Sequence, residues 1–262
     1  MGAKYTFWHQ LGLDFFRKDL IEEIAVKNTP FFIANAKNGI DEIKNNYKVS
    51  GSKLFCLPQY LSMNAEFHNR KKIKEELNIN KDSVVIGMVS HYREEKLFDL
   101  LFETFLKMDE SNSIHLIFLG DKTNSLDTKR KYDYFIEKIE ALNLSYKISV
   151  LSEYPVAKVL SVLDIGVLVS TIEGTPNVVM EYMLYGLPVV ATNHIGCEKL
   201  LNSNELLIRN NHKELAEKLK FLINNAEDRK RVGAFNANEI MKYSKENYFN
   251  DLTRILTTKS NR

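Results

Sequence analysis

Short, mostly apolar runs alternate with longer amphipathic stretches along most of the chain. Residues 84–89 (VVIGMV) and 114–119 (IHLIFL) are nearly uninterrupted apolar runs rich in β-branched side chains. Runs of this length and composition predict buried β-strands. Four further runs predict strands on the same grounds, at residues 147–151, 164–169, 187–191 and 205–208.

The stretches between these runs carry apolar residues at helical spacing. In residues 96–108, for example, Leu97 and Leu101 fall on one face of a helix. The same spacing predicts further helices at residues 129–142, 155–163, 177–185, 212–224, 226–243 and 245–257. Buried strands that alternate with helices are typical of a parallel sheet covered on both faces. The predicted fold class is therefore α/β, with a doubly wound, Rossmann-like parallel sheet.

The first 63 residues form a smaller group of predicted elements. Helices at 20–26 and 40–47 alternate with strands at 30–34 and 53–57. A unit with so few strands is too small to bury its own sheet, so we expect it to pack against the main domain. The pattern divides the chain into three parts, residues 1–63, 64–243 and 244–262.

Composition and charge fit an ordinary globular protein, with 44% hydrophobic and 27% charged residues. The formal net charge of +2 argues against nucleic acid as the main partner. Cys56 and Cys197 lie too far apart for a CxxC metal motif and suit a reducing compartment. No apolar run reaches the ~20 residues of a membrane-spanning helix, and residues 1–10 lack a signal-peptide pattern. We expect a cytoplasmic protein, with contact to the inner face of the membrane left open.

The loop that follows the predicted strand at residues 164–169 is predicted to bind an anion. Ligands of such sheets bind beyond the carboxyl ends of the strands, where helix N-termini present free amides. Gly174 lets the backbone turn and approach a ligand closely. Pro176 suits the beginning of a helix, where a missing N–H costs nothing. The backbone amides of Thr175, Asn177 and Val178 are therefore predicted to face an anion.

Two glutamates belong to the same segment. Glu173 lies in the loop, and Glu181 follows eight residues later in the predicted helix. A carboxylate binds paired sugar hydroxyls well, because it accepts two charge-assisted hydrogen bonds. The two carboxylates can thus reach different parts of one extended ligand. Taken alone, the residues also fit a plainer alternative, in which Glu173 caps the helix and Glu181 is solvated.

Residues 173–192 (EGTPNVVMEYMLYGLPVVAT) resemble the E-x7-E segment of the family 4 retaining glycosyltransferases of the GT-B fold, which build bacterial surface polysaccharides. The match holds many positions at fixed spacing: Ser170, Glu173, Gly174, Pro176, Asn177, Glu181, Met183, Gly186 and residues 188–192. The resemblance implies that Glu173 contacts hydroxyls of the donor sugar and that Glu181 holds the ribose. It implies no metal and no other cofactor, with a UDP-sugar as the favoured donor.

Residues 90–96 (SHYREEK) resemble the G-R-x4-K loop of the same family. Lys96 falls on the lysine position, whereas His91 replaces the arginine, and Arg93 lies two residues further on. The resemblance implies that Arg93 and Lys96 hold the diphosphate, with His91 beside them. The predicted catalytic residues are Glu173, Arg93 and Lys96, and the two cationic side chains would stabilise the negative charge that develops as the diphosphate leaves.

The family has two Rossmann-like domains with the active site between them. The resemblance implies that residues 1–63 are the tail of the acceptor-side first domain, that the rest of that domain lies upstream, and that the last helix crosses back towards it. The expected function is transfer of a sugar from a nucleoside-diphosphate sugar to a glycan or lipid-linked acceptor in surface polysaccharide biosynthesis. The alternative is a non-catalytic or truncated nucleotide-sugar-binding module. An epimerase fits poorly, because the 173–177 loop and its spacing to Gly186 follow the transferase pattern.

Three weaker indications complete the pattern. Residues 151–154 fall where the family contacts the nucleotide base. His9, in the run FWHQ, is interpreted as part of a buried aromatic anchor, with an acceptor-side role as the alternative. His194, next to the strand at 187–191, is interpreted as a surface histidine.

Overall fold

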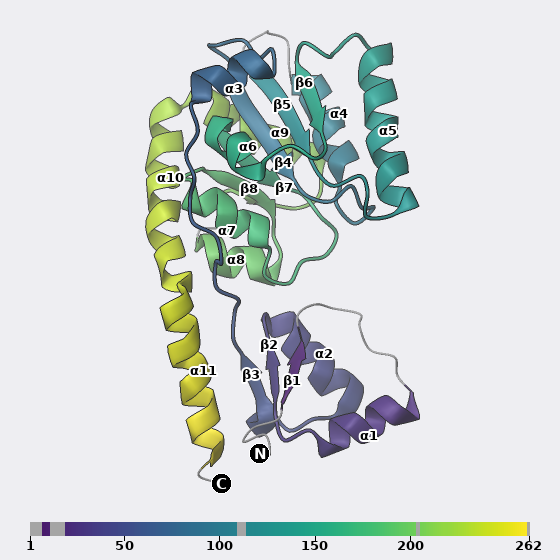
Figure 1. Ribbon diagram of the computed structural model, residues 1–262, viewed down its shortest axis with the longest axis vertical. Helices are drawn as coiled ribbons and strands as arrows, with labels where there is room; N and C mark the ends of the chain where they lie inside the picture. Colours follow the sequence, from purple (N-terminus) through teal and green to yellow (C-terminus); the bar gives the residue numbers. More distant parts are fainter. Residues whose placement is uncertain (1–6, 11–18, 109–113, 203–204, 261–262) are drawn as a thin grey trace.

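A computed structural model describes residues 7–10, 19–108, 114–202 and 205–260 of the chain. Its larger part is a six-stranded sheet in which every neighbouring pair of strands is parallel (Figure 1). In spatial order the strands are β6 (Ile148–Leu151), β5 (Ile114–Leu119), β4 (Val84–Val89), β7 (Ile165–Leu168), β8 (Val189–Thr192) and β9 (Leu207–Ile208). The order runs outward from β4 in one direction and from β7 in the other. This is the predicted doubly wound sheet, with its topological switch point between β4 and β7.

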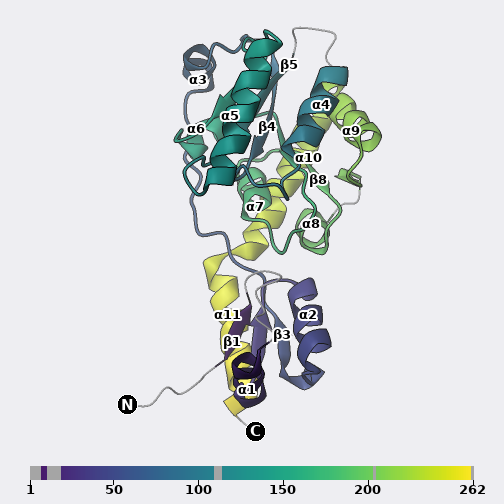
Figure 2. The ribbon, with the colours of Figure 1, turned by 90° about the vertical axis from the view of Figure 1, so that its right-hand side faces the viewer.

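Helices cover both faces of this sheet. In Figure 2, α3 and α6 lie to the left of the sheet and α4 and α9 lie to the right. The helices of this unit are α3 (Arg70–Glu76), α4 (Phe98–Met108), α5 (Leu126–Ala141), α6 (Val156–Val162), α7 (Asn177–Leu184), α8 (Ile195–Leu201), α9 (His212–Asn224) and α10 (Ala226–Glu239). They enclose one large hydrophobic core, and its strand residues are almost completely buried. We call this body the six-stranded unit.

Local polar contacts explain where the helices differ from the prediction. Helix α5 begins three residues earlier than expected, because the Ser125 hydroxyl accepts from the Thr128 amide and Thr128 returns the bond in a capping box. Helix α3 lies within a polar stretch that gave no helical signal. Its Asn69 side chain caps the first turn, and Ile73 packs into the core. Helix α8 was also not predicted.

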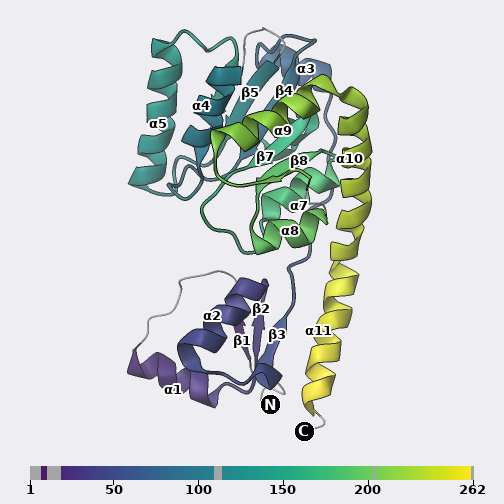
Figure 3. The same ribbon diagram turned by 180° about the vertical axis from the view of Figure 1, so that it is seen from behind.

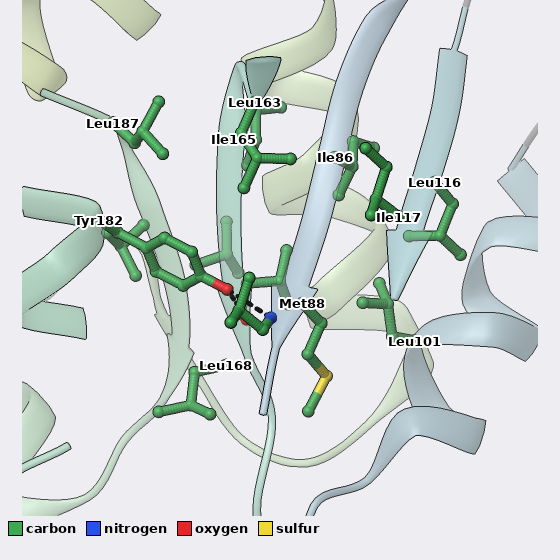
Figure 4. Close-up of a cluster of buried hydrophobic side chains, with 14 of the residues drawn as sticks. Ile86, Met88, Leu101, Leu116, Ile117, Leu163, Ile165, Leu168, Tyr182 and Leu187 are labelled. Atoms are coloured by element: carbon green, nitrogen blue, oxygen red, sulfur yellow. Dashed lines mark hydrogen bonds between the residues drawn. The ribbon is translucent and has the colours of Figure 1, made fainter. Parts of the chain in front are cut away.

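A tyrosine wedge separates the two strands at the switch point. The pairing of β4 with β7 ends at Gly87 and Gly166. Beyond that pair, the Tyr182 hydroxyl accepts from the Val89 amide at 2.8 Å and donates to the Gly87 carbonyl at 3.2 Å (Figure 4). A Cβ on Gly166 would lie 2.5 Å from the Tyr182 ring, so the glycine makes room for the wedge. The strands can therefore diverge here without leaving the Val89 amide unbonded.

The turn after α7 is closed by a Schellman motif. Gly186 has a φ of +66°, the left-handed conformation that glycine adopts without strain. Its amide donates to Met183, and the Leu187 amide donates to Tyr182. Helix α10 packs closely on this turn, since a Cβ on Gly233 would lie 2.0 Å from the Gly186 carbonyl oxygen.

The second, smaller sheet has three parallel strands in the order β1-β2-β3. We call it, with its helices, the three-stranded unit: β1 (Trp8–Gln10), α1 (Leu20–Asn28), β2 (Phe32–Ala34), α2 (Lys37–Tyr47), a 3-10 turn (Gly51–Lys53) and β3 (Leu54–Cys56). One small cluster of Val26, Phe32 and Ile43 fills the space between the sheet and its helices. Strand β1 gave no clear signal in the sequence; the other strands and helices were predicted.

The C-terminal helix joins the two units. Helices α10 and α11 (Lys245–Ser260), linked by a 3-10 turn (Ile240–Tyr243), form one long column beside both sheets (Figures 1 and 3). Helix α11 packs against the three-stranded unit, where Tyr248 and Leu252 lie over Phe31 and Leu57. Within the described residues, no helix is long and apolar enough to cross a membrane.

Candidate functional site

A cavity of about 600 Å³ opens at the carboxyl ends of β4 and β7, at the switch point. Its walls come from the ends of β4, β5 and β6 and from the segment between β7 and α7. Eight of the predicted site residues line it: His91, Arg93, Lys96, Glu173, Pro176, Asn177, Val178 and Glu181. Gly174 and Thr175 do not line it: Thr175 lines a separate cavity together with Asn35, and Gly174 lies against the Asn35 side chain.

The loop between β4 and α4 is held by a buried tyrosine. Tyr92 is 1% exposed, and its hydroxyl donates to the Leu151 carbonyl at the end of β6 at 3.0 Å. This anchor leaves its neighbours His91 and Arg93 on the cavity wall. The Arg93 side chain is 51% exposed and lies 3.8 Å from Glu95, a weak surface contact that leaves the guanidinium available to a ligand.

Lys96 and Glu173 form an ion pair across the cavity wall. Their side chains are only 18% and 9% exposed, so little water screens the pair. The backbone supports it, because Lys96 bridges Ser170 and the Leu97 amide donates to the Val169 carbonyl at 3.0 Å. The sequence predicted separate roles for Lys96 and Glu173, and the structure brings the two side chains into direct contact.

Residues 170–176, which we call the glutamate loop, are fixed at their start by three side chains. The Ser170 amide donates to the Thr192 hydroxyl at 3.1 Å, and its carbonyl accepts from Asn210 at 2.7 Å. The same carbonyl lies 3.0 Å from Nε2 of His194. His194 is therefore a half-buried support of the loop rather than a surface histidine. This contact could not be predicted from the sequence, because Ser170 and His194 meet only where two adjacent strands end.

The middle of the glutamate loop packs between α8 and the three-stranded unit. A Cβ on Gly196, in the first turn of α8, would lie 1.5 Å from the Gly174 carbonyl oxygen. On the other side, the Asn38 side-chain amide donates to the Glu173 carbonyl at 2.9 Å. The Thr175 hydroxyl donates to the Asn35 carbonyl at 2.8 Å. Sequence analysis did not identify Asn35 or Asn38.

Helix α7 presents its N-terminus and Glu181 to the cavity. Pro176 is the N-cap residue, and Asn177 and Val178 follow in the first turn, where amides have no partner within the helix. Burial raises the pKa of Glu181 above its usual range. Within the described residues, the Glu181 carboxylate has no hydrogen-bond or ion-pair partner in the protein, so it is available to hydroxyl donors of a ligand.

The far wall comes from the ends of β5 and β6. Hydrogen bonds from Thr123 lower the pKa of Asp121, with a smaller contribution from His91, so this carboxylate stays charged. Tyr154, in the segment with the predicted base contact, also lines the cavity. Burial and the nearby Glu76 carboxylate raise the pKa of Tyr154 to about 12, so its phenol stays protonated at neutral pH.

A second cavity of about 350 Å³ adjoins the first. Asn177 and Glu181 line both cavities. The second cavity is completed by His9 of β1, Tyr60 and Tyr248, so it lies between the two units. The His9 side chain is exposed there, and the interpretation of His9 as a buried anchor is wrong. Its neighbour Trp8 packs on Phe32 instead.

Neither cavity has the ligand set of a metal site. In the part of the chain that the structure describes, no group of three or more histidine, cysteine or acidic side chains could hold a metal ion. The two cysteines do not contribute: Cys56 is an exposed free thiol, and Cys197 is a buried one.

Comparison with solved structures matches nearly the whole chain to glycosyltransferases. A glycosyltransferase from Rickettsia africae ESF-5 matches with a TM-score of 0.81 and 16% identity over 96% of this chain and 70% of that one. HepE from Anabaena, solved with UDP, matches with a TM-score of 0.84 and 16% identity over 97% and 72% of the two chains. A TarM variant from S. aureus, solved with Fondaparinux, alpha-GlcNAc-glycerol and UDP, matches with a TM-score of 0.69 and 20% identity over 95% and 50%. At these identities the likeness shows the fold.

Comparison of the sequence with known protein families identifies the family of this chain. Among curated proteins, none matches the sequence. The model of the family described as glycosyl transferases group 1 matches residues 69–239. These residues include β4 to β9 and every predicted site residue. The chain therefore belongs to the glycosyl transferases group 1 family and has the GT-B type of fold, as the sequence motifs predicted.

Proposed function

We propose that the cavity at the switch point binds a nucleoside-diphosphate sugar, with a UDP-sugar as the favoured donor. The protein transfers the sugar, with retention of configuration, to a glycan or lipid-linked acceptor in surface polysaccharide biosynthesis. One observation carries this proposal. Cationic side chains, a helix N-terminus and the unpartnered Glu181 carboxylate face a single cavity of about 600 Å³ at the switch point of the sheet.

The diphosphate is assigned to the two walls that carry positive charge. Arg93, Lys96 and His91 lie on one wall, and the first-turn amides of Asn177 and Val178 lie on the other. A phosphate oxygen that accepts from Lys96 competes with Glu173 for the ammonium group. Diphosphate binding therefore frees the Glu173 carboxylate to accept from hydroxyls of the donor sugar.

The ribose is assigned to Glu181. Its carboxylate lacks a protein partner, and burial raises its pKa. Two ribose hydroxyls would satisfy it with charge-assisted hydrogen bonds. The base then falls towards Tyr154 and the ends of β5 and β6, which form the remaining wall.

Transfer follows from how the leaving group is stabilised. The bond between the anomeric carbon and the diphosphate oxygen breaks, and the acceptor oxygen bonds to the same face of the sugar. The acceptor proton passes to the departing diphosphate. Arg93, Lys96 and the α7 amides offset the charge that develops on the diphosphate, so the proposal assigns no metal to this step. The second cavity, with His9, is the proposed acceptor side, where close approach of the two reactants favours transfer.

Similar structures support the choice of donor. HepE from Anabaena has been solved with UDP, with UDP and glucose, and with UDP-glucose. The TarM variant has been solved with UDP and a glycan-derived ligand set. The acceptor class, the link to surface polysaccharides and any contact with a membrane surface rest on the sequence resemblance and belong to the proposal.

Calorimetric titration with a UDP-sugar tests the donor site. The parent chain should bind UDP-glucose, UDP-galactose or UDP-N-acetylglucosamine, and Glu181→Ala should weaken binding at least about tenfold, because it removes charge-assisted hydrogen bonds. Glu217→Ala, an exposed glutamate of α9, is the matched control and should bind like the parent. If the parent binds no UDP-, GDP- or ADP-sugar at millimolar concentration, the proposal fails.

A second measurement separates transfer from binding alone. The chain covers 70–72% of the Rickettsia and Anabaena structures, so a binding module of the same fold is the alternative. Release of UDP from a bound UDP-sugar on addition of a glycan acceptor supports the transferase. Binding without release, across a panel of glycan and lipid-linked acceptors, favours the module.

A further inference from the structure

We propose that Asn38 of the three-stranded unit is a positioning residue that sets the glutamate loop for recognition of the donor sugar. The proposal rests on the function proposed above, in which Glu173 contacts that sugar. Asn38 lies in the first turn of α2, and 135 residues separate it from Glu173 in the sequence. Its side chain nevertheless reaches the main chain of the loop.

The orientation of the Asn38 amide follows from its two hydrogen bonds. Its Nδ2 donates to the Glu173 carbonyl at 2.9 Å, and its Oδ1 accepts from the Gly39 amide at 3.0 Å. A carbonyl can only accept and an amide N–H can only donate, so the flipped amide would lose both bonds. Helix α2 is itself anchored by Ile43, which is fully buried in the small core. The donor group is therefore held rigidly in place.

A second contact from the same unit acts on the other side of Gly174. The Thr175 hydroxyl donates to the Asn35 carbonyl at 2.8 Å. The Gly174 backbone lies against the Asn35 side chain, because a Cβ built on Gly174 would lie 3.6 Å from the Asn35 amide group. Two residues that follow β2, Asn35 and Asn38, thus contact the loop tip (residues 172–175) on both sides of Gly174.

Besides these two contacts, the tip packs against Gly196 of α8, and Glu173 pairs with Lys96. Among the described residues, the backbone groups of residues 172–175 make no backbone–backbone hydrogen bond; the last one before them is from the Thr171 amide to the Glu95 carbonyl, at 2.9 Å. The direction of the Glu173 carbonyl fixes the direction of its Cα–Cβ bond, and hence where its carboxylate can point. Loss of the Asn38 bond frees that carboxylate to follow Lys96 alone.

This arrangement predicts a selective defect. The groups assigned to the diphosphate and the ribose belong to the six-stranded unit, and the hydrogen bonds of the Asn38 side chain go to Glu173 and Gly39 instead. Only the contact between Glu173 and the sugar depends on Asn38. A change at Asn38 should therefore weaken binding of a UDP-sugar and leave binding of UDP nearly unchanged.

The test uses the full chain, titrated with UDP and with whichever of UDP-glucose, UDP-galactose and UDP-N-acetylglucosamine the parent binds most tightly. Asn38→Asp keeps the shape of the side chain but cannot donate to the Glu173 carbonyl, and its charge suits the N-terminus of α2. It should raise the Kd of the UDP-sugar about 3- to 10-fold, the loss expected for one hydrogen bond between uncharged groups. The Kd of UDP should change less than twofold. Asn38→Ala should act in the same direction.

Asn45→Ala is the matched control, because Asn45 is an exposed residue of the same helix. It should bind both ligands like the parent. The positioning role is overturned if both Asn38 variants keep the parent's ratio of the two Kd values, whether they bind normally or lose UDP and UDP-sugar affinity equally. If the parent itself binds no UDP and no UDP-sugar, the proposed function fails instead, so the two failures are distinct.

Discussion

The six-stranded and three-stranded units differ in what holds each of them together. The six-stranded unit has its own extensive core, which runs through all of its strands and helices. The three-stranded unit has one internal cluster around Phe32 and Ile43, and a second cluster that it shares with α11. One of its two clusters is thus completed by a helix that continues α10 of the other unit.

The difference assigns separate tasks to the two units. The unit with the large core carries the cations, Glu181 and the N-terminus of α7, all on a rigid frame. The unit with the small core touches the glutamate loop through Asn35 and Asn38, and contributes His9 to the second cavity. Because fewer buried side chains support it, the three-stranded unit should open locally at a lower free energy than the unit that carries the nucleotide groups.

Leucine truncation tests this contrast with the largest expected effect. Leu219 of α9 is fully buried in the large core, so Leu219→Ala should lower the global free energy of unfolding by about 3–5 kcal/mol. Leu252 of α11 is half-buried against the three-stranded unit. Leu252→Ala should cost about 1 kcal/mol, because less surface is lost. Urea unfolding followed by circular dichroism measures both.

The two variants should also differ in which elements show faster hydrogen exchange. Hydrogen exchange of Leu252→Ala should rise in β1, β2 and β3 and stay at the parent level in β4 and β5. In Leu219→Ala it should rise throughout the six-stranded unit. Equal losses of protection in both units after Leu252→Ala would contradict the idea of two separately supported cores.

Acid should weaken the six-stranded unit through one buried histidine. His115 of β5 is 2% exposed and bonded to Ser149 at 2.9 Å. Its pKa is lowered from 6.5 to about 4, because burial and, to a smaller extent, the charge of Lys74 outweigh a hydrogen bond to the Tyr146 backbone that raises it. Between these pH values the unfolded chain takes up a proton that the folded chain does not. The free energy of unfolding therefore falls as pH decreases, by about 3 kcal/mol at pH 4.

The matched variant isolates this effect from the many carboxylates that also titrate. His115→Gln keeps a polar group near Ser149 and has no proton to gain. The free energy of unfolding is measured in urea for variant and parent from pH 7 to pH 4. As the pH falls, the free energy of the parent should decrease by about 3 kcal/mol more than that of the variant. A constant difference between variant and parent over this range would mean that His115 titrates normally in the fold.

Much of the six-stranded unit could be predicted, because its signals are local. The runs 84–89 and 114–119 became β4 and β5 without change, since continuous apolar residues fit only a strand buried on both faces. The alternation of strands and helices then placed the site beyond the carboxyl ends of the strands. Eight of the ten predicted site residues line one cavity there, because motif spacing and sheet topology constrain the same loop.

Contacts between distant segments could not be predicted in this way. Nothing near Asn38 indicates that its amide meets a carbonyl 135 residues away. Gly174 and Thr175 were expected to face the ligand, yet both contact Asn35 of the three-stranded unit. A glycine signals a close approach of backbone, but the sequence does not tell which partner approaches. The support of Ser170 by His194 was missed for the same reason.

Removal of one tyrosine hydroxyl from each unit gives the smallest expected effect and the finest comparison. Tyr182→Phe leaves the buried Val89 amide without its acceptor at the point where β4 and β7 diverge. The cost should be about 1–2 kcal/mol in global unfolding, typical of an unsatisfied buried amide. Since Val89 and Glu181 both line the cavity, UDP binding should also weaken, by less than about tenfold. Urea unfolding and UDP titration measure the two effects.

Tyr47→Phe makes the same deletion in the three-stranded unit. There the hydroxyl donates to the carboxylate of Glu22, a residue that is only 7% exposed. Its loss should raise hydrogen exchange in α1 and α2 while the midpoint of global unfolding and the Kd of UDP stay at parent values. Global destabilisation by Tyr47→Phe equal to that by Tyr182→Phe would mean that the two units unfold as one. The nucleotide side would then depend on the three-stranded unit, and the selective defect expected at Asn38 would lose its basis.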